Sequence, residues 1–235
     1  MNTQNKIINE FSDEYINLCN LNFTKKNKLI IKNFLKDNFA NEIYNYSLNE
    51  KNWTLSTGIN NIKYEKSQTP QFEKVNQLQI KNVNKAFGDD SFSYIFNRAM
   101  NNVKNMSFYE FALRKTLNSQ EFIDFLNNIT NLNLTKLNTL FLSKYKSGNF
   151  LSPHSDKGNG KLAFVINITK NWKPQYGGNL HFMNDLRNEI TETYVPEFNS
   201  FIIFNVPENV GIPHFISHVA PNVKLSRFAI TGWFD

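Results

Sequence analysis

Four histidines and one aspartate are the residues whose types and spacing could support metal chemistry in this sequence. His154 and Asp156 form an H-x-D pair, and the other histidines are His181, His214 and His218. In a strand, residues i and i+2 point to the same side, so one imidazole and one carboxylate can converge on one ion. Two imidazoles and one carboxylate on one face suit non-haem Fe(II) and O₂. The third ligand must therefore come from elsewhere in the chain.

Arg227 is a second candidate for chemistry, because it begins an otherwise apolar stretch that reads as a strand. A buried arginine needs an anionic partner, since an unpaired charge is costly to bury. Its guanidinium fits a carboxylate through two parallel hydrogen bonds. That carboxylate could belong to the protein, as Asp235 or Glu197, or to a bound ligand.

Three segments carry a family resemblance over roughly residues 139–235. They are the H-x-D pair, the stretch from Ser217 to Pro221 with His218 inside it, and the strand from Arg227 to Phe234. The intervening Trp172–Leu180 is similar to a W-x-P-x-x-G-G-x-L stretch before a core strand. Together these motifs resemble the prolyl-hydroxylase branch of the 2-oxoglutarate/Fe(II) dioxygenases. Cytosolic ribosomal-protein prolyl-hydroxylase-like proteins are the nearest group.

The resemblance implies a role for each matching residue. His154, Asp156 and His218 would be the iron ligands, and Arg227 would hold the C5 carboxylate of 2-oxoglutarate. The other side chains expected in the cosubstrate pocket are Tyr145, Leu180, Thr231 and Trp233. Fe(II), 2-oxoglutarate and O₂ are the expected cofactor and cosubstrates, with ascorbate as a possible reductant.

One position departs from the family's pattern. Relatives often carry a tyrosine on the strand after the H-x-D pair, where its hydroxyl meets 2-oxoglutarate. Here that strand, Phe164–Ile168, has no tyrosine near Ile166. Asn167 or Thr231 is the expected replacement. Tyr145 is either a cosubstrate contact or an ordinary core aromatic.

The remaining histidines are expected outside the metal site. His214 and His218 have helical spacing, but Pro213 and Pro221 favour an extended segment. Four residues of strand span about 13 Å, too far for both histidines to bind one ion. His214 is therefore expected to be structural or on the substrate side, and His181 to be structural.

Hydrophobic periodicity divides the chain into a helical part and a strand-rich part. Residues 1–50 and 91–130 are predicted to be helical, with Ser119 as a helix cap. Residues 53–64 are predicted to form a strand or hairpin around Gly58. Residues 65–90 are polar and are predicted to be a surface excursion that could act as a lid.

From residue 138 onward, short apolar runs alternate with turn residues, which favours a β-sandwich or barrel. The predicted fold is α+β: a double-stranded β-helix, or jelly roll, at 138–235. The helical support region, 1–137, would pack on it within the same globule.

Composition limits the kinds of partner and location that we expect for this protein. The net charge is +6, but the lysines are scattered, so a nucleic-acid substrate is not expected. Cys19 is the single cysteine, which excludes an intrachain disulfide and fits a reducing compartment. No signal-peptide core and no apolar stretch of about 20 residues is present, so a cytoplasmic protein without a membrane span is predicted.

The expected substrate is a prolyl residue of a cytosolic protein or peptide. A free amino acid or another small molecule is the alternative within the same chemistry. Nucleic-acid demethylation would use a similar site, but such relatives usually carry a second arginine where this chain has Trp233. A jelly-roll binding module without catalysis is the alternative from another class. The sequence leaves the oligomeric state open.

Overall fold

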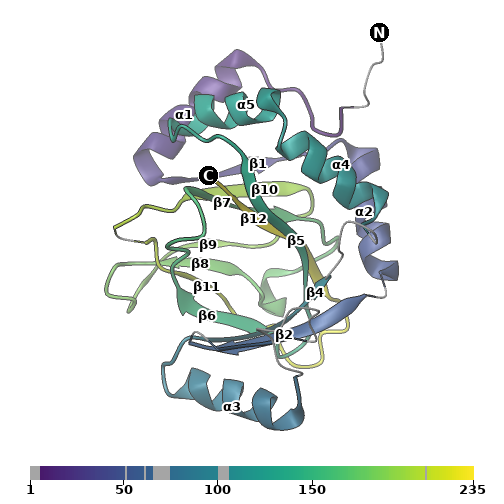
Figure 1. The fold of residues 1–235 in the computed structure, drawn as a ribbon, viewed down its shortest axis with the longest axis vertical. Coiled ribbons are helices and arrows are strands. Elements are labelled where there is room, and N and C mark those ends of the chain that lie inside the picture. Colours follow the sequence, from purple (N-terminus) through teal and green to yellow (C-terminus); the bar gives the residue numbers. More distant parts are fainter. Residues whose placement is uncertain (1–5, 51, 61, 66–74, 100–105, 210) are drawn as a thin grey trace.

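The chain folds around one curled antiparallel sheet, as the computed structural model shows (Figure 1). The structure describes residues 6–50, 52–60, 62–65, 75–99, 106–209 and 211–235. The strand order is β1-β10-β7-β12-β5-β4-β6-β11-β8-β9, with β2 joined to β4 and β3 to β2. The strands are β1 Lys28–Lys32, β2 Trp53–Ile59, β3 Ile62–Glu65, β4 Ser93–Ala99, β5 Leu137–Tyr145, β6 Phe150–His154, β7 Leu162–Asn167, β8 Leu180–Met183, β9 Ile190–Tyr194, β10 Ser200–Asn205, β11 His214–Ile216 and β12 Arg227–Phe234.

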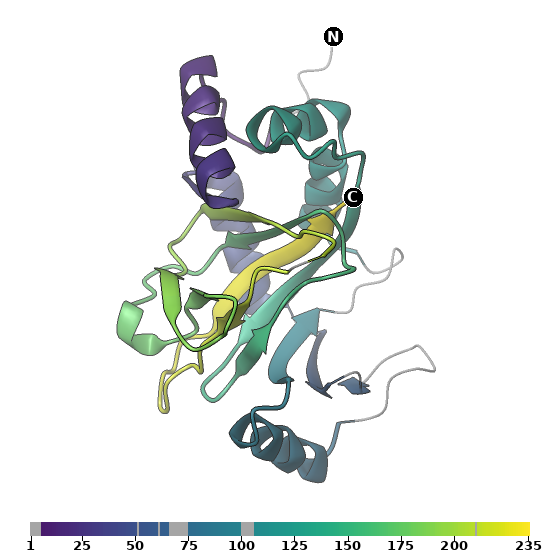
Figure 2. The ribbon, with the colours of Figure 1, turned by 90° about the vertical axis from the view of Figure 1, so that its left-hand side faces the viewer.

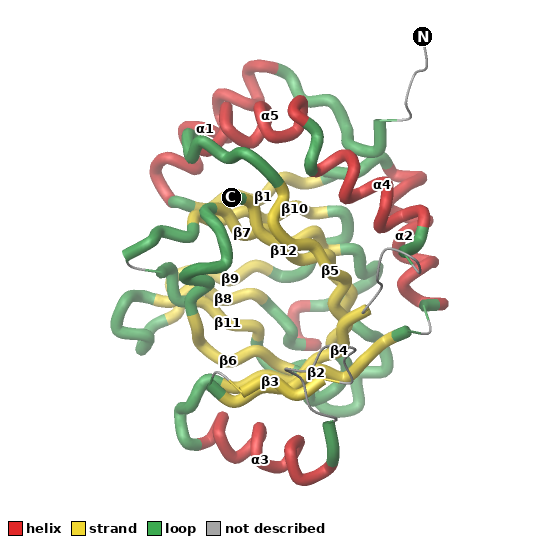
Figure 3. Tube along the Cα trace, in the orientation of Figure 1, coloured by secondary structure: helices red, strands yellow, loops and turns green. Residues whose placement is uncertain are grey.

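Helices cover the outer face of this sheet. They are α1 Asp13–Lys26, α2 Asp37–Asn49, α3 Gln77–Gly88, α4 Phe108–Leu117 and α5 Gln120–Thr130, with a 3-10 turn at Pro174–Tyr176. In Figure 3 the strands occupy the centre and the helices the periphery. Figure 2 shows α3 at the opposite end of the molecule from α1 and α5. No helix in the described part of the chain is long and apolar enough to cross a membrane.

Strand alternation in β12 separates the two sides of the sheet. Phe228, Ile230 and Phe234 pack into the cluster shared with the helices. Arg227 and Ala229 face the interior of the curl, where Ala229 joins a second apolar cluster. A strand that is buried on both faces in this way needs cover on each side, which the helices and the opposing strands supply. The predicted jelly-roll core with helices packed on it is confirmed.

Two strands lie in segments that were predicted to be helical. β1 interrupts residues 1–50 and pairs along its whole length with β10. β4 lies within residues 91–130 and pairs with β2, β5 and β6. Both strands are stabilised by partners distant in sequence, which a local periodicity cannot reveal. The predicted division at residue 138 stays a prediction, although strands on both sides of it share one sheet.

Of the other local predictions, the hairpin and the helix cap are confirmed, and the surface excursion is corrected in part. The hairpin at 53–64 is present as β2 and β3. Ser119 caps α5 by accepting a hydrogen bond from the backbone N–H of Phe122 at 3.3 Å. The predicted excursion at 65–90 is corrected for its second half, where α3 packs its buried Val83 beside β4. Residues 66–74 of the predicted lid lie outside the described residues.

Replacing Gly232 with alanine is predicted to destabilise the fold. It lies in β12, and a Cβ there would overlap the carbonyl oxygen of Thr139 and come within 2.7 Å of the Phe164 ring. We expect Gly232→Ala to lower the free energy of unfolding by about 1–3 kcal/mol, the usual cost of overpacking a core. Urea unfolding measures it. Gly88→Ala is the matched control, because nothing lies within 4 Å of the added methyl. Equal stability of both variants would contradict the packing described for β12.

Candidate metal and cosubstrate site

The two histidines of the site are neighbours across one strand pair. β6 and β11 pair antiparallel with His154 directly opposite His214. Directly opposed residues project to the same side of a sheet, so both imidazoles point into the curl. Their ring centroids lie 4.3 Å apart. β8 pairs with the other edge of β11 and places Phe182 opposite His214, so the strand carrying His214 is held on both sides.

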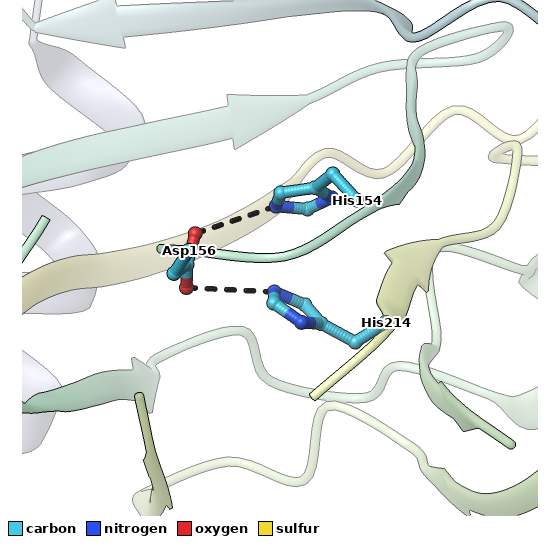
Figure 4. Close-up of side chains that lie close together, drawn as sticks. All are labelled: His154, Asp156 and His214. Carbon is cyan, nitrogen blue, oxygen red and sulfur yellow. Dashed lines mark ion pairs between the residues drawn. The ribbon is translucent and has the colours of Figure 1, made fainter. Parts of the chain in front are cut away.

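Asp156 completes a cluster that could hold a metal ion (Figure 4). It follows β6 by two residues, and its carboxylate lies between the two rings. One oxygen is 3.5 Å from Nε2 of His154, and the other is 3.5 Å from Nε2 of His214. The ligand atoms all lie within 4.8 Å of one another. Two imidazoles and one carboxylate are the donor set suited to non-haem Fe(II).

The two rings are oriented by the backbone. Nδ1 of His154 lies 2.9 Å from the carbonyl oxygen of Ser152, and Nδ1 of His214 lies 2.9 Å from that of Ile212. When Nδ1 donates to a carbonyl, the proton is fixed there and the lone pair of Nε2 faces the cluster. Both histidines therefore turn Nε2 toward the point where an ion would sit.

Burial sets the protonation states of the cluster. Burial by itself raises the pKa of Asp156, but its interactions with His214 and His154 outweigh that effect and lower the pKa to about 2. Burial lowers the pKa of His214 to about 4, helped by repulsion from His154 and opposed by Asp156. At neutral pH the cluster thus holds an ionised carboxylate and an uncharged His214, which are the forms that bind metals.

The structure brings His214, and not the predicted third ligand His218, into this cluster. The ring of His218 instead stacks on Phe150 at 4.2 Å and meets the edge of Phe87 from α3 at 4.6 Å. The physical reason is register. The chain leaves β11 after Ile216, and the residue after His218, Val219, forms a bridge with Gly177 and backbone hydrogen bonds with Gly148 and Asn149 just before β6. The expected extended conformation around His214 is observed, and the assignment of His218 as an iron ligand stays a prediction.

His181 lies outside the cluster, as expected of a structural residue. It is on β8, where Nδ1 lies 2.9 Å from Oγ1 of Thr193 and the ring stacks on Phe215 at 4.6 Å. A bond to the neighbouring strand and a stacked ring give this histidine a role in packing β8 between β9 and β11.

Arg227 is a buried cation whose surroundings are uncharged. Its side chain is almost fully enclosed, with 2% of the residue exposed. Nη2 donates to Oδ1 of Asn167 at 3.2 Å, and the guanidinium lies over the ring of Tyr145 at 5.1 Å. Nε has no hydrogen-bond partner among the described residues. Asn167 therefore touches the guanidinium, in the strand where the family's tyrosine is missing.

The protein carboxylates considered as partners of Arg227 are engaged elsewhere. Glu197 pairs with Lys32 at 2.8 Å, and Asp235 lies 3.9 Å from Lys136. A buried guanidinium that donates once to a neutral amide retains donors for an anion. The arrangement fits the carboxylate of a ligand.

The metal cluster and Arg227 open into one cavity of about 1010 Å³. The four further residues predicted to contact the cosubstrate also line it, namely Tyr145, Leu180, Thr231 and Trp233. Thr231 and Trp233 share a face of β12 with Arg227, which agrees with the alternation expected along that strand. Their contacts with a cosubstrate stay predictions.

Comparison with known proteins finds a family model for the part of the chain that contains the cluster. Residues 140–235 match the family model of the 2OG-Fe(II) oxygenase superfamily. This part of the chain is similar to that superfamily. The matched range contains the three residues of the cluster, together with Arg227 and the strands that carry them. Members of the 2OG-Fe(II) oxygenases use Fe(II), 2-oxoglutarate and O₂. The cluster of His154, Asp156 and His214 fits the metal, and Arg227 fits a carboxylate of 2-oxoglutarate.

One curated relative is the prolyl 3-hydroxylase OGFOD1 of Xenopus laevis, which is 31% identical over 128 residues. The match covers 52% of this chain and 24% of that protein, so the chain spans about a quarter of the relative's length. Part of the chain is thus similar both to this relative and to the family model of the 2OG-Fe(II) oxygenase superfamily.

Solved structures share the fold of this chain. A prolyl hydroxylase of Trichoplax adhaerens, in complex with a hypoxia inducible factor peptide fragment, has a TM-score of 0.62 at 16% identity, covering 94% of this chain and 89% of that one. A prolyl-4-hydroxylase of Pseudomonas putida has a TM-score of 0.57 at 11% identity, covering 93% and 97%. At these identities the likeness concerns the fold alone.

Replacing either of two histidines distinguishes the ligand from its neighbour. His214→Ala is expected to weaken Fe(II) binding by more than about 100-fold, because loss of a mere hydrogen-bond partner of a ligand already costs 10–100-fold. His218→Ala is the matched control and is expected to bind Fe(II) like the unaltered protein. Anaerobic titration calorimetry measures both. The reverse pattern would restore His218 as the ligand.

The lowered pKa of His214 predicts a pH dependence of the metal-free protein. His214 takes up a proton near pH 6.5 in the unfolded state, but only near pH 4 in the folded state. As the pH is lowered from 6.5 to 4, the free energy of unfolding should therefore fall by on the order of 3 kcal/mol through this group alone. Urea unfolding with a chelator across this range, compared with His214→Asn, measures the contribution. An identical pH dependence in the variant would contradict it.

Proposed function

We propose that this protein is an Fe(II)- and 2-oxoglutarate-dependent dioxygenase that hydroxylates a prolyl residue of a protein and releases succinate and CO₂. One observation carries the dioxygenase part. The cluster of His154, Asp156 and His214 opens into the same cavity as Arg227, a buried cation with donors to spare. A metal and a dicarboxylate can thus be held side by side in one enclosed space.

Each residue has a task in this chemistry. The bound iron supplies the activation of O₂ that hydroxylates an unactivated C–H bond. His154, Asp156 and His214 hold it from one side, which leaves the opposite side for the substrates. Arg227 holds the far carboxylate of 2-oxoglutarate, and Asn167 keeps the guanidinium in place. The apolar walls, with Leu180 among them, exclude water from the reacting groups.

Support for a prolyl substrate comes from the relatives. The curated relative is named a prolyl 3-hydroxylase, and one structural neighbour was solved with a protein-derived peptide. A peptide segment also suits the size of the cavity, which at about 1010 Å³ lies at the upper end of the range usual for small-molecule pockets. A cytoplasmic location remains a prediction from the single cysteine.

Replacing Arg227 tests the cosubstrate site. Arg227→Gln is expected to raise the KM for 2-oxoglutarate by about 30-fold or more, since removing one partner of a buried charge pair costs 2–5 kcal/mol. Succinate formation measured against 2-oxoglutarate concentration gives this KM. Lys115→Gln is the control, because Lys115 is an exposed cation on α4 and outside the cavity. An unchanged KM in Arg227→Gln would remove the arginine from the cosubstrate site.

The substrate class is tested by mass spectrometry of host proteins incubated with the enzyme, Fe(II) and 2-oxoglutarate. We expect a gain of one oxygen atom on prolyl residues that requires 2-oxoglutarate and is absent with His214→Ala. Oxygen gained only on other residue types, or only on small molecules, would contradict a protein prolyl hydroxylase while leaving the dioxygenase chemistry intact.

A further inference from the structure

Asn167 is a buried amide whose two ends meet different groups. It ends β7, where it lies directly opposite Ser200 of β10 on one side and Ala229 of β12 on the other. Its Oδ1 accepts the hydrogen bond from Nη2 of Arg227 at 3.2 Å, and its Nδ2 donates to Oγ of Ser200 at 3.1 Å. Asn167 and Ser200 are both fully buried. Asn167 thus links the guanidinium of β12 to the hydroxyl of β10.

The hydroxyl of Ser200 decides which end of this amide faces Arg227. Its single proton is donated to the carbonyl oxygen of Glu197 at 2.8 Å, so Oγ can only accept a hydrogen bond from Asn167. An amide donates through its nitrogen and accepts through its oxygen. Nδ2 must therefore face Ser200, and Oδ1 must face the guanidinium. The reversed amide would place N–H groups of Asn167 and Arg227 against each other and leave buried donors without acceptors, which is costly.

The turn that precedes Ser200 is anchored by Asn199. This residue has a φ of 59°, in the left-handed region that asparagine tolerates. Its side chain accepts a hydrogen bond from the backbone N–H of Leu35 at 2.8 Å and donates to the carbonyl oxygen of the same residue at 2.7 Å. Leu35 is fully buried in the link between β1 and α2, outside the range 140–235 that the family model matches. The position of Ser200 therefore depends on the N-terminal part of the chain.

We propose that Ser200 and Asn167 form a positioning pair, which holds the guanidinium of Arg227 in the orientation that binds the far carboxylate of 2-oxoglutarate. Neither residue is among the described residues that line the cavity, so their effect on binding passes through Arg227. A guanidinium that is already oriented loses less freedom when an anion binds. A neutral amide orients it without adding a negative charge that would compete with the ligand. The inference rests on the proposed function and adds two positioning residues to its cosubstrate site.

Two 2-oxo acids of equal length separate the far carboxylate from the rest of the cosubstrate. 2-Oxoglutarate carries this carboxylate, and 2-oxopentanoate has a methyl group in its place. Anaerobic titration calorimetry of the Fe(II)-loaded protein gives the dissociation constant of each acid without any turnover. We call the dissociation constant of 2-oxopentanoate divided by that of 2-oxoglutarate the carboxylate preference. It reports the contact between Arg227 and the far carboxylate.

Ser200→Ala removes the acceptor that orients Asn167. The carboxylate preference is expected to fall by about threefold to tenfold, the usual effect of losing one hydrogen bond, while 2-oxopentanoate binds within about twofold of its affinity for the unaltered protein. Ser47→Ala is the matched control, because Ser47 is a fully buried serine of α2 whose hydroxyl donates to the carbonyl oxygen of Ile43. It should leave the preference unchanged. A full preference in folded Ser200→Ala would overturn the proposal.

Asn167→Asp tests the same pair if Ser200→Ala does not fold. The new carboxylate would pair with Arg227 and repel the far carboxylate of 2-oxoglutarate, so the preference should fall by about 30-fold or more. A full preference in this variant would also overturn the proposal. The unaltered protein separates this inference from the proposed function. If it does not bind 2-oxoglutarate at all, the proposed function fails and the inference fails with it, whereas a preference that the variants retain overturns the inference alone.

Discussion

The antiparallel pairing of β6 with β11 is the constraint on which the site depends. It places His154 opposite His214 and leaves Asp156, just beyond the end of β6, between their rings. A shift of one residue in the register of β6 and β11 would turn one imidazole to the other face of the sheet, and the three side chains would no longer meet. β8 supports the site indirectly, because it pairs with the other edge of β11 and helps to fix that register. The helices act further out, since their apolar faces cover the strands that close the curl.

The surroundings of Arg227 favour the binding of an anion. The guanidinium is buried against a neutral amide and an aromatic ring, which leaves a charge in a low-dielectric setting with few partners. Alone, such a charge destabilises the folded state. A carboxylate bound there would meet a donor group that is already desolvated and oriented, so little further ordering is needed on binding. The same logic explains why the metal cluster and the arginine lie in one cavity. In the proposed function, a metal would bind one end of a dicarboxylate and Arg227 the other.

The sequence predicted the strand-rich half of the chain well, because β7 and β12 are apolar runs bounded by turn residues. It failed for β1, whose Leu29, Ile30 and Ile31 fit helical and strand periods equally and which depends on pairing with β10. The resemblance named His218 as the third ligand, whereas the structure brings His214 into the cluster through the register of β11 with β6. That register is a property of the assembled sheet, and no local pattern encodes it.

The central claim is that one cavity holds Fe(II) and 2-oxoglutarate together through the His154, Asp156 and His214 cluster and Arg227. Anaerobic absorption spectroscopy tests it most directly. When 2-oxoglutarate chelates bound Fe(II), a weak visible charge-transfer band appears. We expect this band only when both components are present, with saturation at one iron per chain. Failure of the band to form with both present, in protein that is folded and binds Fe(II), would contradict the claim.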